Sequence, residues 1–383
     1  MGSLKSATVT SLMTAGGHEQ VVYVADRDAG LRGVIAIHST ALGPSLGGVR
    51  FWHYANEHDG LLDALRLSEA MTLKAAVAGL HQGGGKTVVM WDDPDRPRDT
   101  ALLHVLGRAI DSLGGRYLAA EDVGATTADM DGLADVTPWA TGVDVARGGS
   151  GDPSPVTAAG AVHAMHAVGA ALDGEPSLRG RRVVIQGAGH VGSHLARRLL
   201  AEGAEVSVSD ALESRATALA RELPVTVIPA DRAVFAPCDI LAPCALGGVF
   251  DDETIPRLAC RAIVGAANNQ LGAVGADQQL ARRGILYAPD FVVNAGGIIN
   301  IAEEFVGYDR DRALASVARI EDTTARVLAT AAEHDVTPLE AAERLARERI
   351  ASEGSGRWEP GSPAAWTNGE PLRRLRPAAP SRA

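Results

Sequence analysis

The fold is indicated most clearly by residues 182–192, which read Arg-Val-Val-Ile-Gln-Gly-Ala-Gly-His-Val-Gly. An apolar strand over 182–186 runs into the pattern G-x-G-x-x-G, and a helix is predicted from His190 to Glu202. A second strand over 205–209 ends at Asp210. The glycines of such a fingerprint allow a tight turn and close approach of a pyrophosphate, which rests on the helix N-terminus. We therefore predict a dinucleotide site formed by Gly187, Ala188, Gly189, His190, Val191, Gly192 and Asp210.

The acidic residue of this fingerprint favours NAD as the cofactor. The carboxylate of Asp210 is placed to accept the ribose hydroxyls, and it would repel a 2′-phosphate. Arg215 is close enough in the sequence to leave NADP open as an alternative.

The regions on either side of the fingerprint differ in pattern. On the C-terminal side, short strands at 239–241, 262–264 and 284–287 alternate with helices, which predicts a parallel, doubly wound sheet. The N-terminal half mixes predicted elements: strands at 21–24, 33–37 and 116–120, helices at 59–80 and 100–113, and glycine-rich loops at 42–50 and 82–86. The predicted fold class is α/β with two domains, a mixed α/β domain followed by a Rossmann-type domain.

Residues 147–155, rich in glycine, serine and proline, form the clearest linker. We predict a first domain over 1–146 and a second over 147–308. A helical region over 309–351 follows, and 352–383, rich in Pro, Gly, Ser and Arg, is predicted to be a disordered tail.

Composition excludes several classes of protein. The 383 residues are 46% hydrophobic and carry a net charge of −11 without a basic stripe, so no nucleic-acid partner is expected. We find neither a signal peptide nor an apolar stretch of transmembrane length, which predicts a soluble cytoplasmic protein without a membrane partner.

The sequence does not predict a metal site. Cys238, Cys244 and Cys260 lack the spacing of a zinc site or a disulfide frame, and we interpret Cys238 and Cys244 as buried, inert thiols. His163 and His166 are three apart on a predicted helix, but the sequence gives no evident third ligand. We interpret both as packing or surface residues.

The distribution of lysine points to chemistry. Among 36 basic residues, lysine occurs only at Lys5, Lys74 and Lys86. Arginine is not deprotonated in proteins, whereas a buried lysine amine can titrate near neutral pH. Lys74 shares a helical stripe with Leu67 and Met71, and Lys86 follows a run of three glycines. If both project into one cleft, the two amines are candidates for binding a carboxylate and for general-base catalysis.

Two neighbouring interpretations need separating. Gly85-Lys86-Thr87 is not a nucleotide phosphate loop, because Leu80 occupies a position where that pattern needs glycine. Asp122, at the end of a predicted strand, is either a third catalytic residue or, with Glu121, an ordinary solvated loop residue.

The role of two aromatic residues near the first glycine-rich loop is also open: Trp52 and Tyr54 line either the site or a subunit interface.

Seven short motifs occur in the order of a known family. They are Gly-Pro-Ser-Leu-Gly-Gly-Val-Arg at 43–50, Met-Thr-Leu-Lys at 71–74, Gly-Gly-Gly-Lys-Thr at 83–87, Ala-Glu-Asp-Val-Gly at 120–124, Pro-Ser-Pro-Val-Thr at 153–157, Ala-Ala-Asn-Asn-Gln at 266–270 and Asn-Ala-Gly-Gly at 294–297. Over residues 15–350 the chain resembles the glutamate/leucine/phenylalanine/valine dehydrogenase family, in particular its branched-chain members. The resemblance implies a homo-oligomer in which two domains enclose a cleft and the C-terminal helices, over 309–351, return to the first domain. It also implies NAD-dependent, reversible deamination of an L-amino acid to a 2-oxo acid and ammonia.

The resemblance also implies roles for individual residues. Lys74, with the backbone of Gly47 and Gly48, holds the substrate α-carboxylate. Lys86 activates the water that attacks the imino acid, and Asp122 exchanges protons with the amino nitrogen. The remaining implied contacts are Leu46, Met71, Ala120, Asn268, Ile298 and Ile301 for the substrate, and Thr157, Ala245, Leu246 and Asn268 for the cofactor.

The implied side-chain pocket is aliphatic, with no lysine or serine to pair with a glutamate side chain. Its two isoleucines favour valine, leucine or isoleucine over phenylalanine, although one methylene changes selectivity by only about 1–3 kcal/mol. Val49 and His81-Gln82 depart from the family pattern. They leave open a dehydrogenase for another apolar or non-proteinogenic amino acid. The alternative from another class is a non-catalytic sensor of NAD or an amino acid.

Overall fold

The computed structural model describes residues 7–93, 98–245 and 247–358, which divide into two compact units. The first consists of Met1–Asp152, Ile301–Arg310 and Ala346–Ala383, and the second of Pro153–Asn300 and Asp311–Leu345. Each unit contains its own sheet. No helix in the described part of the chain combines the length and the apolar character needed to span a membrane.

The division between the units differs from the predicted boundaries. The helical region 309–351 is expected to return to the first domain, but residues 311–345 belong to the second unit. The sequence also places the first boundary after residue 146 and assigns 301–308 to the second domain, whereas the structure assigns everything up to Asp152, and 301–310, to the first unit. The reason is a long-range contact: the buried Glu304 carboxylate accepts hydrogen bonds from the backbone N–H groups of Gly142 and Ser150.

The first unit is built on a mixed sheet with strand order β1-β2-β4-β3-β5. Its strands are β1 (Gln20–Asp26), β2 (Leu31–Ser39), β3 (Ser45–Trp52), β4 (Gly83–Met90) and β5 (Tyr117–Glu121). The strands predicted at 21–24 and 33–37 are confirmed, and they form the antiparallel pair β1–β2. β3 lies between β4 and β5 and runs parallel to both.

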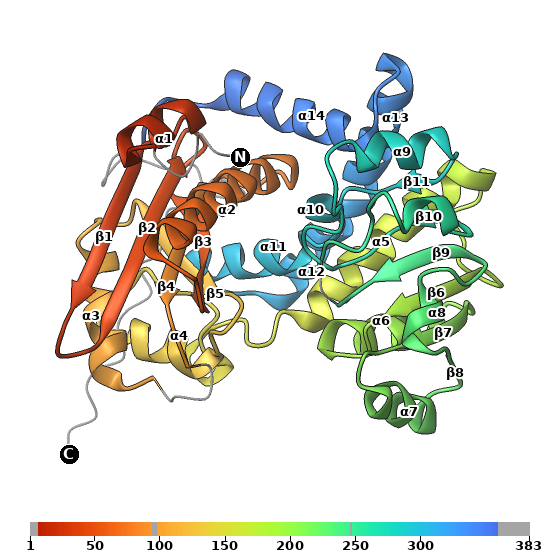
Figure 1. Cartoon of the computed structure of the whole chain (residues 1–383), viewed down its shortest axis with the longest axis horizontal. Coiled ribbons are helices and arrows are strands. Elements are labelled where there is room, and N and C mark those ends of the chain that lie inside the picture. The colour runs from red at the N-terminus through yellow and green to blue at the C-terminus, as the bar shows by residue number, and fades with distance from the viewer. Residues whose placement is uncertain (1–6, 94–97, 246, 359–383) are drawn as a thin grey trace. The chain divides into compact units, whose positions relative to one another are not determined.

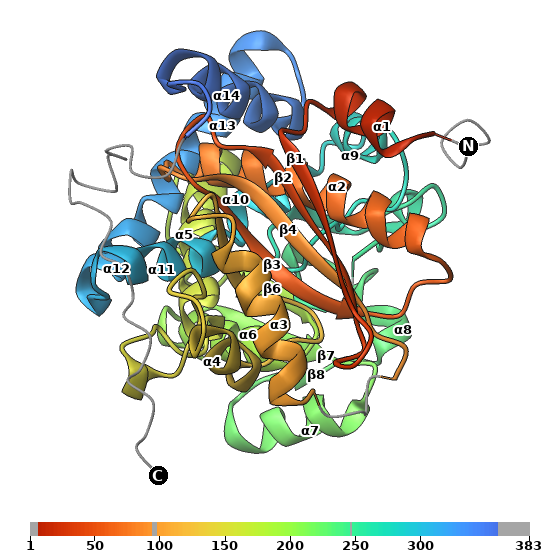
Figure 2. The same cartoon turned by 90° about the vertical axis from the view of Figure 1, so that its left-hand side faces the viewer.

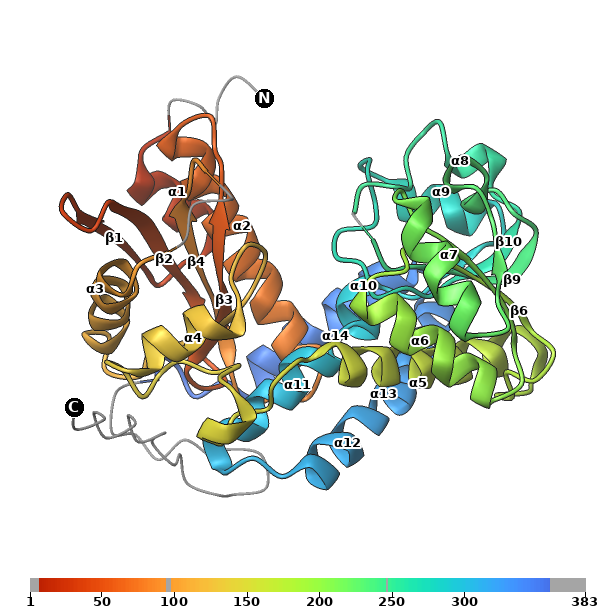
Figure 3. The same ribbon diagram turned by 90° about the horizontal axis from the view of Figure 1, so that it is seen from below.

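Helices cover both faces of this sheet. On one face lies α2 (Glu57–Val77), with α1 (Val9–Gly16) beside it, and on the other lie α3 (Thr100–Asp111) and α4 (Thr127–Ala134) (Figure 2 and Figure 3). The apolar residues Leu61, Ala64 and Leu65 of α2 pack in one cluster with Val88 and Met90 of β4. Side chains alternate along a strand, so Lys86 projects from this same α2-covered face.

Two segments predicted as glycine-rich loops are strands. Residues 45–52 form β3, and the glycines at 83–85 open β4. Glycine inside a strand often marks a close backbone approach. A Cβ atom on Gly47 would lie 1.7 Å from the carbonyl oxygen of Gly85, and one on Gly84 would lie 2.2 Å from the backbone nitrogen of Thr72 in α2. The glycines therefore serve tight packing of β3, β4 and α2.

The second unit contains the predicted parallel, doubly wound sheet, in the order β11-β10-β9-β6-β7-β8 (Figure 1). Its strands are β6 (Arg182–Gln186), β7 (Glu205–Ser209), β8 (Thr226–Val227), β9 (Cys238–Pro243), β10 (Cys260–Ile263) and β11 (Leu286–Tyr287). Only β8 has no counterpart among the predicted strands. The order reverses between β6 and β9, and in such sheets ligands bind outside the carboxyl ends of the strands at this point.

The helices of this unit lie on both faces of the sheet. Residues of α8 (Ala230–Ala233) and α9 (Ala276–Arg282) pack against Val184, Leu241 and Ile263. Gly192 of α6 (His190–Ala201) lies against Ile185, whose side chain points to the opposite face. The unit also contains α5 (Ser154–Asp173), α7 (Glu213–Glu222) and α10 (Asp290–Val293).

The C-terminal helical region consists of separate helices: α11 (Gly296–Ala302), the short η4 (Glu303–Val306), α12 (Arg310–Ala318), α13 (Ile320–His334) and α14 (Pro338–Glu353). The tail was expected to be disordered from residue 352, but α14 continues to Glu353. In addition, the buried Trp358 donates its backbone N–H to Thr40 Oγ1. The rest of the predicted tail, 359–383, lies outside the described residues.

Candidate active site

The first unit brings together a buried lysine and an aspartate. Lys86 Nζ lies 2.6 Å from Asp122 Oδ2, and the two side chains are 5% and 17% exposed. Lys86 lies in β4, and Asp122 directly follows β5. These two strands lie on opposite sides of β3. Asp122 is therefore the partner of a buried amine, which does not fit its interpretation as a solvated loop residue.

A glycine on the central strand makes this contact possible. Strands two positions apart in a sheet are separated by roughly 9–10 Å, so a side chain on the strand between them would normally keep them apart. At Gly48 of β3 there is none. A Cβ atom there would lie 2.5 Å from Asp122 Cβ and 3.0 Å from Lys86 Nζ. Gly48 thus leaves the space in which the amine and the carboxylate meet.

An ion-pair network extends from this pair towards α2. Arg50, two residues after Gly48 and on the same face of β3, donates Nε–H to Asp122 Oδ2 over 2.8 Å and Nη1–H to Asp63 Oδ2 over 3.0 Å. The Tyr54 hydroxyl donates to the same Asp63 oxygen over 2.6 Å. Tyr54 is therefore part of the network beside the site, while Trp52 is 52% exposed.

The network tunes the two titratable groups in opposite directions. Burial, reinforced by the charge of Arg50, lowers the pKa of Lys86, although the neighbouring Asp122 opposes the shift. For Asp122, burial alone would raise the pKa. The charges of Lys86 and Arg50 outweigh burial and hold it at about 2. The site therefore keeps a carboxylate ionised beside an amine that gives up its proton more readily than an ordinary lysine.

Tyr117 holds the backbone of Gly47 and Gly48 in β3. Tyr117 of β5 is fully buried, and its hydroxyl donates to the carbonyl oxygen of Gly47 over 2.8 Å. Its ring fills the space beside Gly85, where a Cβ atom would lie 2.7 Å away. Sequence analysis assigned no role to Tyr117 or Arg50. The alternation of β3 would have placed Arg50 on the face of Gly48, but only with β3 recognised as a strand.

The other predicted substrate residues divide between the two units. Lys74 and Met71 are half-buried on α2, which covers the face from which Lys86 projects; Leu46, Ala120 and Ile301 of the first unit are buried. Asn268 and Ile298 belong to the second unit. That all of these residues surround one ligand stays a prediction.

In the second unit, each fingerprint glycine has a distinct structural role. Gly187 has a φ of +111°, which a residue with a side chain rarely adopts. A Cβ atom on Gly192 would lie 1.9 Å from the Gly187 carbonyl oxygen, so this glycine permits close packing of helix on strand. Around Gly189, the N-cap of α6, nothing lies within 4 Å of such an atom. That open space at a helix N-terminus suits the pyrophosphate of a dinucleotide.

Other predicted cofactor residues lie around this turn. Asp210 follows β7 directly, and its Oδ2 accepts the backbone N–H of Ala188 over 2.9 Å. A Cβ atom on Gly187 would lie 2.9 Å from the nitrogen of Ala245, so the loop after β9 lies against the fingerprint. Asn268 is exposed, and its Oδ1 accepts from Asn294 over 2.7 Å. His190 and Val191 open α6, and Leu246 lies outside the described residues.

Thr157 lies near the start of α5 and is half-buried. Its hydroxyl would lie 3.1 Å from a Cβ atom on Gly297 of α11. Thr157 thus borders the glycine-rich start of α11.

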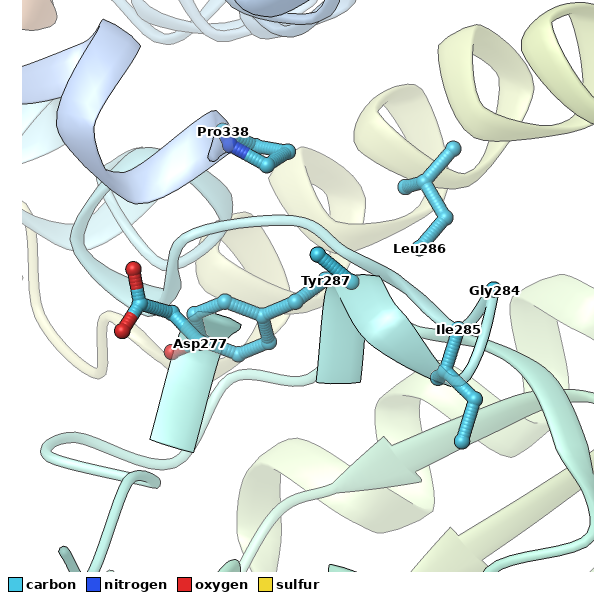
Figure 4. A pocket seen from close by; sticks show the side chains of 7 residues that line it. Asp277, Gly284, Ile285, Leu286, Tyr287 and Pro338 are labelled. Atoms are coloured by element: carbon cyan, nitrogen blue, oxygen red, sulfur yellow. The ribbon is translucent and has the colours of Figure 1, made fainter. Parts of the chain in front are cut away.

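A separate pocket of about 240 Å³ lies beside β11 and the first residue of α14 (Figure 4). Asp277 supplies its carboxylate, which already accepts a hydrogen bond from Thr337 over 2.6 Å. None of the predicted substrate or cofactor residues lines this pocket.

Comparisons with known proteins identify the family. Residues 18–139 match the model of the Glu/Leu/Phe/Val dehydrogenase dimerisation domain, and 148–214 and 207–357 match that of glutamate/leucine/phenylalanine/valine dehydrogenase. The chain belongs to this dehydrogenase family. Its members are oxidoreductases that act on the CH–NH₂ group of amino acids with NAD(P), and the predicted family, fold class and enzyme class are thereby confirmed.

Individual relatives of this dehydrogenase cover most of its length. Valine dehydrogenase of Streptomyces albus is 49% identical over 88% of this chain and 93% of its own length. Leucine dehydrogenase of Thermoactinomyces intermedius is 45% identical over 87% and 91%. The crystal structure of L-tryptophan dehydrogenase from Nostoc punctiforme is 38% identical, covers 90% of this chain and 99% of its own, and has a TM-score of 0.80.

Proposed function

We propose that the chain catalyses the reversible, NAD-dependent oxidative deamination of a branched-chain L-amino acid (valine, leucine or isoleucine) to its 2-oxo acid and ammonia. The observation that carries the proposal is the buried Lys86 amine, 2.6 Å from Asp122, above a strand that has no side chain at Gly48. A lysine amine becomes an effective general base when burial lowers its pKa towards the working pH. The names of the valine and leucine dehydrogenases that share 45–49% of their residues with the chain support the substrate class.

The residues of the first unit divide the chemistry between them. Lys74 and the backbone at Gly47 and Gly48 hold the substrate α-carboxylate. When Lys86 is neutral, as its role as a base requires, its charge no longer lowers the pKa of Asp122. Asp122 then takes a proton from the substrate ammonium group, so that the amine is neutral when the bond between the α-carbon and its hydrogen breaks. A nicotinamide cofactor would supply the acceptor for the hydride of that carbon.

Hydrolysis of the resulting imino acid completes the reaction. Lys86 removes a proton from a water molecule while the water oxygen attacks the imine carbon. Asp122 returns its proton to the nitrogen, and the C–N bond breaks. The oxygen from water forms the C=O bond and passes its remaining proton to the departing nitrogen, which leaves as ammonium. Lys86 releases the other water proton to solvent. Amino acid, NAD⁺ and water thus give 2-oxo acid, ammonium, NADH and one proton. Arg50 is a positioning residue, since it holds Asp122 through a 2.8 Å hydrogen bond.

The fingerprint of the second unit fits a dinucleotide, because Gly189 leaves open space at the N-terminus of α6. Each oxygen of the Asp210 carboxylate accepts one backbone N–H, from Ala188 and Leu212. A carboxylate oxygen accepts more than one hydrogen bond, so both keep capacity for ribose hydroxyls. The same negative charge repels a 2′-phosphate, which favours NAD over NADP.

The assembly and the location of the chain belong to the same proposal. We infer a homo-oligomer, because residues 18–139 match a family model named as a dimerisation domain. The predicted cytoplasmic location stays a prediction, supported by three free cysteines in the described structure.

A substrate panel read by NADH absorbance tests the proposal. We expect turnover with L-valine, L-leucine and L-isoleucine with NAD, and little with L-glutamate. Lys86→Ala should abolish turnover while sparing NAD binding, measured by quenching of tryptophan fluorescence or by calorimetry. NAD binding without turnover of any amino acid would favour the sensor instead. Turnover of only a different apolar amino acid would correct the substrate, and a fully active Lys86→Ala variant would refute the role of Lys86.

A further inference from the structure

The second unit contains a cluster of two histidines and a glutamate. His163 and His166 are three residues apart on α5, so they share one face of that helix. Glu321, in the first turn of α13, faces both of them. Its Oε2 lies 3.4 Å from His163 Nδ1 and 3.3 Å from His166 Nδ1. The sequence alone shows no third group beside the two histidines, whereas in the structure α13 places the Glu321 carboxylate there, 155 residues after His166.

The second nitrogen of His166 has its own partner. His166 Nε2 lies 2.6 Å from Oε2 of Glu202, at the end of α6. A carboxylate oxygen only accepts hydrogen bonds, so a proton lies on Nε2. In the neutral imidazole, Nδ1 then carries a lone pair, and this lone pair points at another carboxylate oxygen, that of Glu321. Two acceptors at 3.3 Å need a positive species between them, which is either a second proton or a metal ion.

The geometry suits a metal ion. Zinc binds histidine nitrogen and carboxylate oxygen at about 2.0–2.2 Å, so two ligand atoms of a tetrahedral site lie about 3.3–3.6 Å apart. The two nitrogen–oxygen distances in the cluster, 3.3 and 3.4 Å, fall in this range. The three ligand atoms all lie within 4.8 Å of one another. The two imidazole rings stand at 86° to each other, with their centroids 5.9 Å apart.

The surroundings suit a metal ion as well. Histidine ligands usually donate their other N–H to a carboxylate, which fixes the tautomer and the ring orientation. Glu202 provides such a carboxylate for His166. The side chains of His163, His166 and Glu321 are 30%, 21% and 39% exposed, so an ion has access from solvent and a fourth position is available for water.

We propose that His163, His166 and Glu321 form a binding site for a divalent transition-metal ion of the zinc type, with Glu202 orienting His166. Imidazole and carboxylate together favour such ions over Mg²⁺ or Ca²⁺, which prefer oxygen ligands. The ion would cross-link α5 to α13. The site contains no residue assigned to the dehydrogenase reaction, so it stands independently of the proposed function.

The test is a metal titration of the full-length, untagged protein after treatment with a chelator. Co²⁺ is the first probe, because its visible absorption reports four-coordinate binding, and Zn²⁺ is then added in competition. We expect one Co²⁺ per chain, displaced by Zn²⁺, and a higher thermal midpoint with Zn²⁺. Glu321→Gln and His163→Asn should each weaken binding by about tenfold or more, and Glu202→Gln by about tenfold.

His53→Asn is the matched control, because the Nδ1 atom of His53 also lies 3.3 Å from a carboxylate oxygen, that of Asp92. It should leave metal binding unchanged. Circular dichroism and the thermal midpoint without metal show whether each variant is folded. If His163→Asn does not fold, Glu321→Gln provides the test, because it preserves the shape of the side chain. Absence of stoichiometric binding to the wild type would overturn the proposal in favour of a protonated ion pair, and equal binding by all variants would place the metal elsewhere.

Discussion

Replacing Asp122 by asparagine tests whether Lys86 depends on a buried counter-charge. The Lys86–Asp122 pair joins groups that are 5% and 17% exposed, whereas Arg32 and Asp92 form a pair at 2.9 Å whose side chains are 50% and 62% exposed. Removing one partner of a buried pair costs about 3–5 kcal/mol, because the other charge stays buried without compensation. An exposed pair contributes less than about 1 kcal/mol. Asp122→Asn should therefore lower the free energy of unfolding severalfold more than Asp92→Asn does.

The loss should also depend on pH. Without Asp122, the Lys86 amine is buried beside the Arg50 guanidinium, and its pKa in the folded state falls further below the value in the unfolded chain. The unfolded state then binds more protons than the folded state, so the stability of the variant rises with pH. We expect the difference between wild type and Asp122→Asn to be larger at pH 7 than at pH 9, since the neutral amine no longer needs a partner.

Urea unfolding followed by tryptophan fluorescence provides the measurement. The tryptophans among the described residues, Trp52, Trp91, Trp139 and Trp358, all lie in the first unit, so their signal reports the unit that contains the pair. The wild type and both variants are compared at each pH. If Asp122→Asn costs no more than Asp92→Asn at pH 7, or if its cost does not change with pH, then Lys86 is not held as a charged group by Asp122.

Three further substitutions test other parts of the structure. Gly48→Ala should lower kcat by about 100-fold with little change in NAD affinity. The reason is that the new Cβ atom would lie 2.5 Å from Asp122 Cβ and displace the Lys86–Asp122 pair. Steady-state kinetics and NAD-binding measurements test this prediction, and an unchanged kcat would contradict it. Asp210→Ser should raise the ratio of kcat/KM for NADP to that for NAD, and an unchanged ratio would remove Asp210 from cofactor selection. Burial raises the pKa of Glu304 to about 7, although hydrogen bonds from Ser150 and Gly142 oppose the shift. Wild-type stability should thus be favoured below about pH 4.5 and decline towards about pH 7; Glu304→Gln should flatten that dependence in urea unfolding.

The dinucleotide fingerprint could be predicted because its determinants are local. Strand, glycine turn, helix and Asp210 follow one another within about thirty residues, and Gly192 packs against Gly187 and Ile185 of this same segment. The first sheet was harder to predict. Gly47 and Gly48 weaken strand propensity, and only the closeness of Gly85 to Gly47 explains why β3 tolerates them. That tertiary contact is absent from any local pattern.

The Lys86–Asp122 pair shows that long-range contacts also limit the prediction of the site. Lysine scarcity singled out Lys86, but nothing in the sequence separated Asp122 from a solvated loop residue, since the two are 36 positions apart. Their contact depends on the strand order β4-β3-β5, which places them on either side of Gly48. Gly48, which lacks a side chain, thus allows Lys86 and Asp122 to meet. The composition of the site therefore depends on the strand order of the sheet as well as on the residue types. The histidine cluster also depends on a long-range contact. His163 and His166 both lie on α5, and Glu321 joins them only because α13 packs against α5.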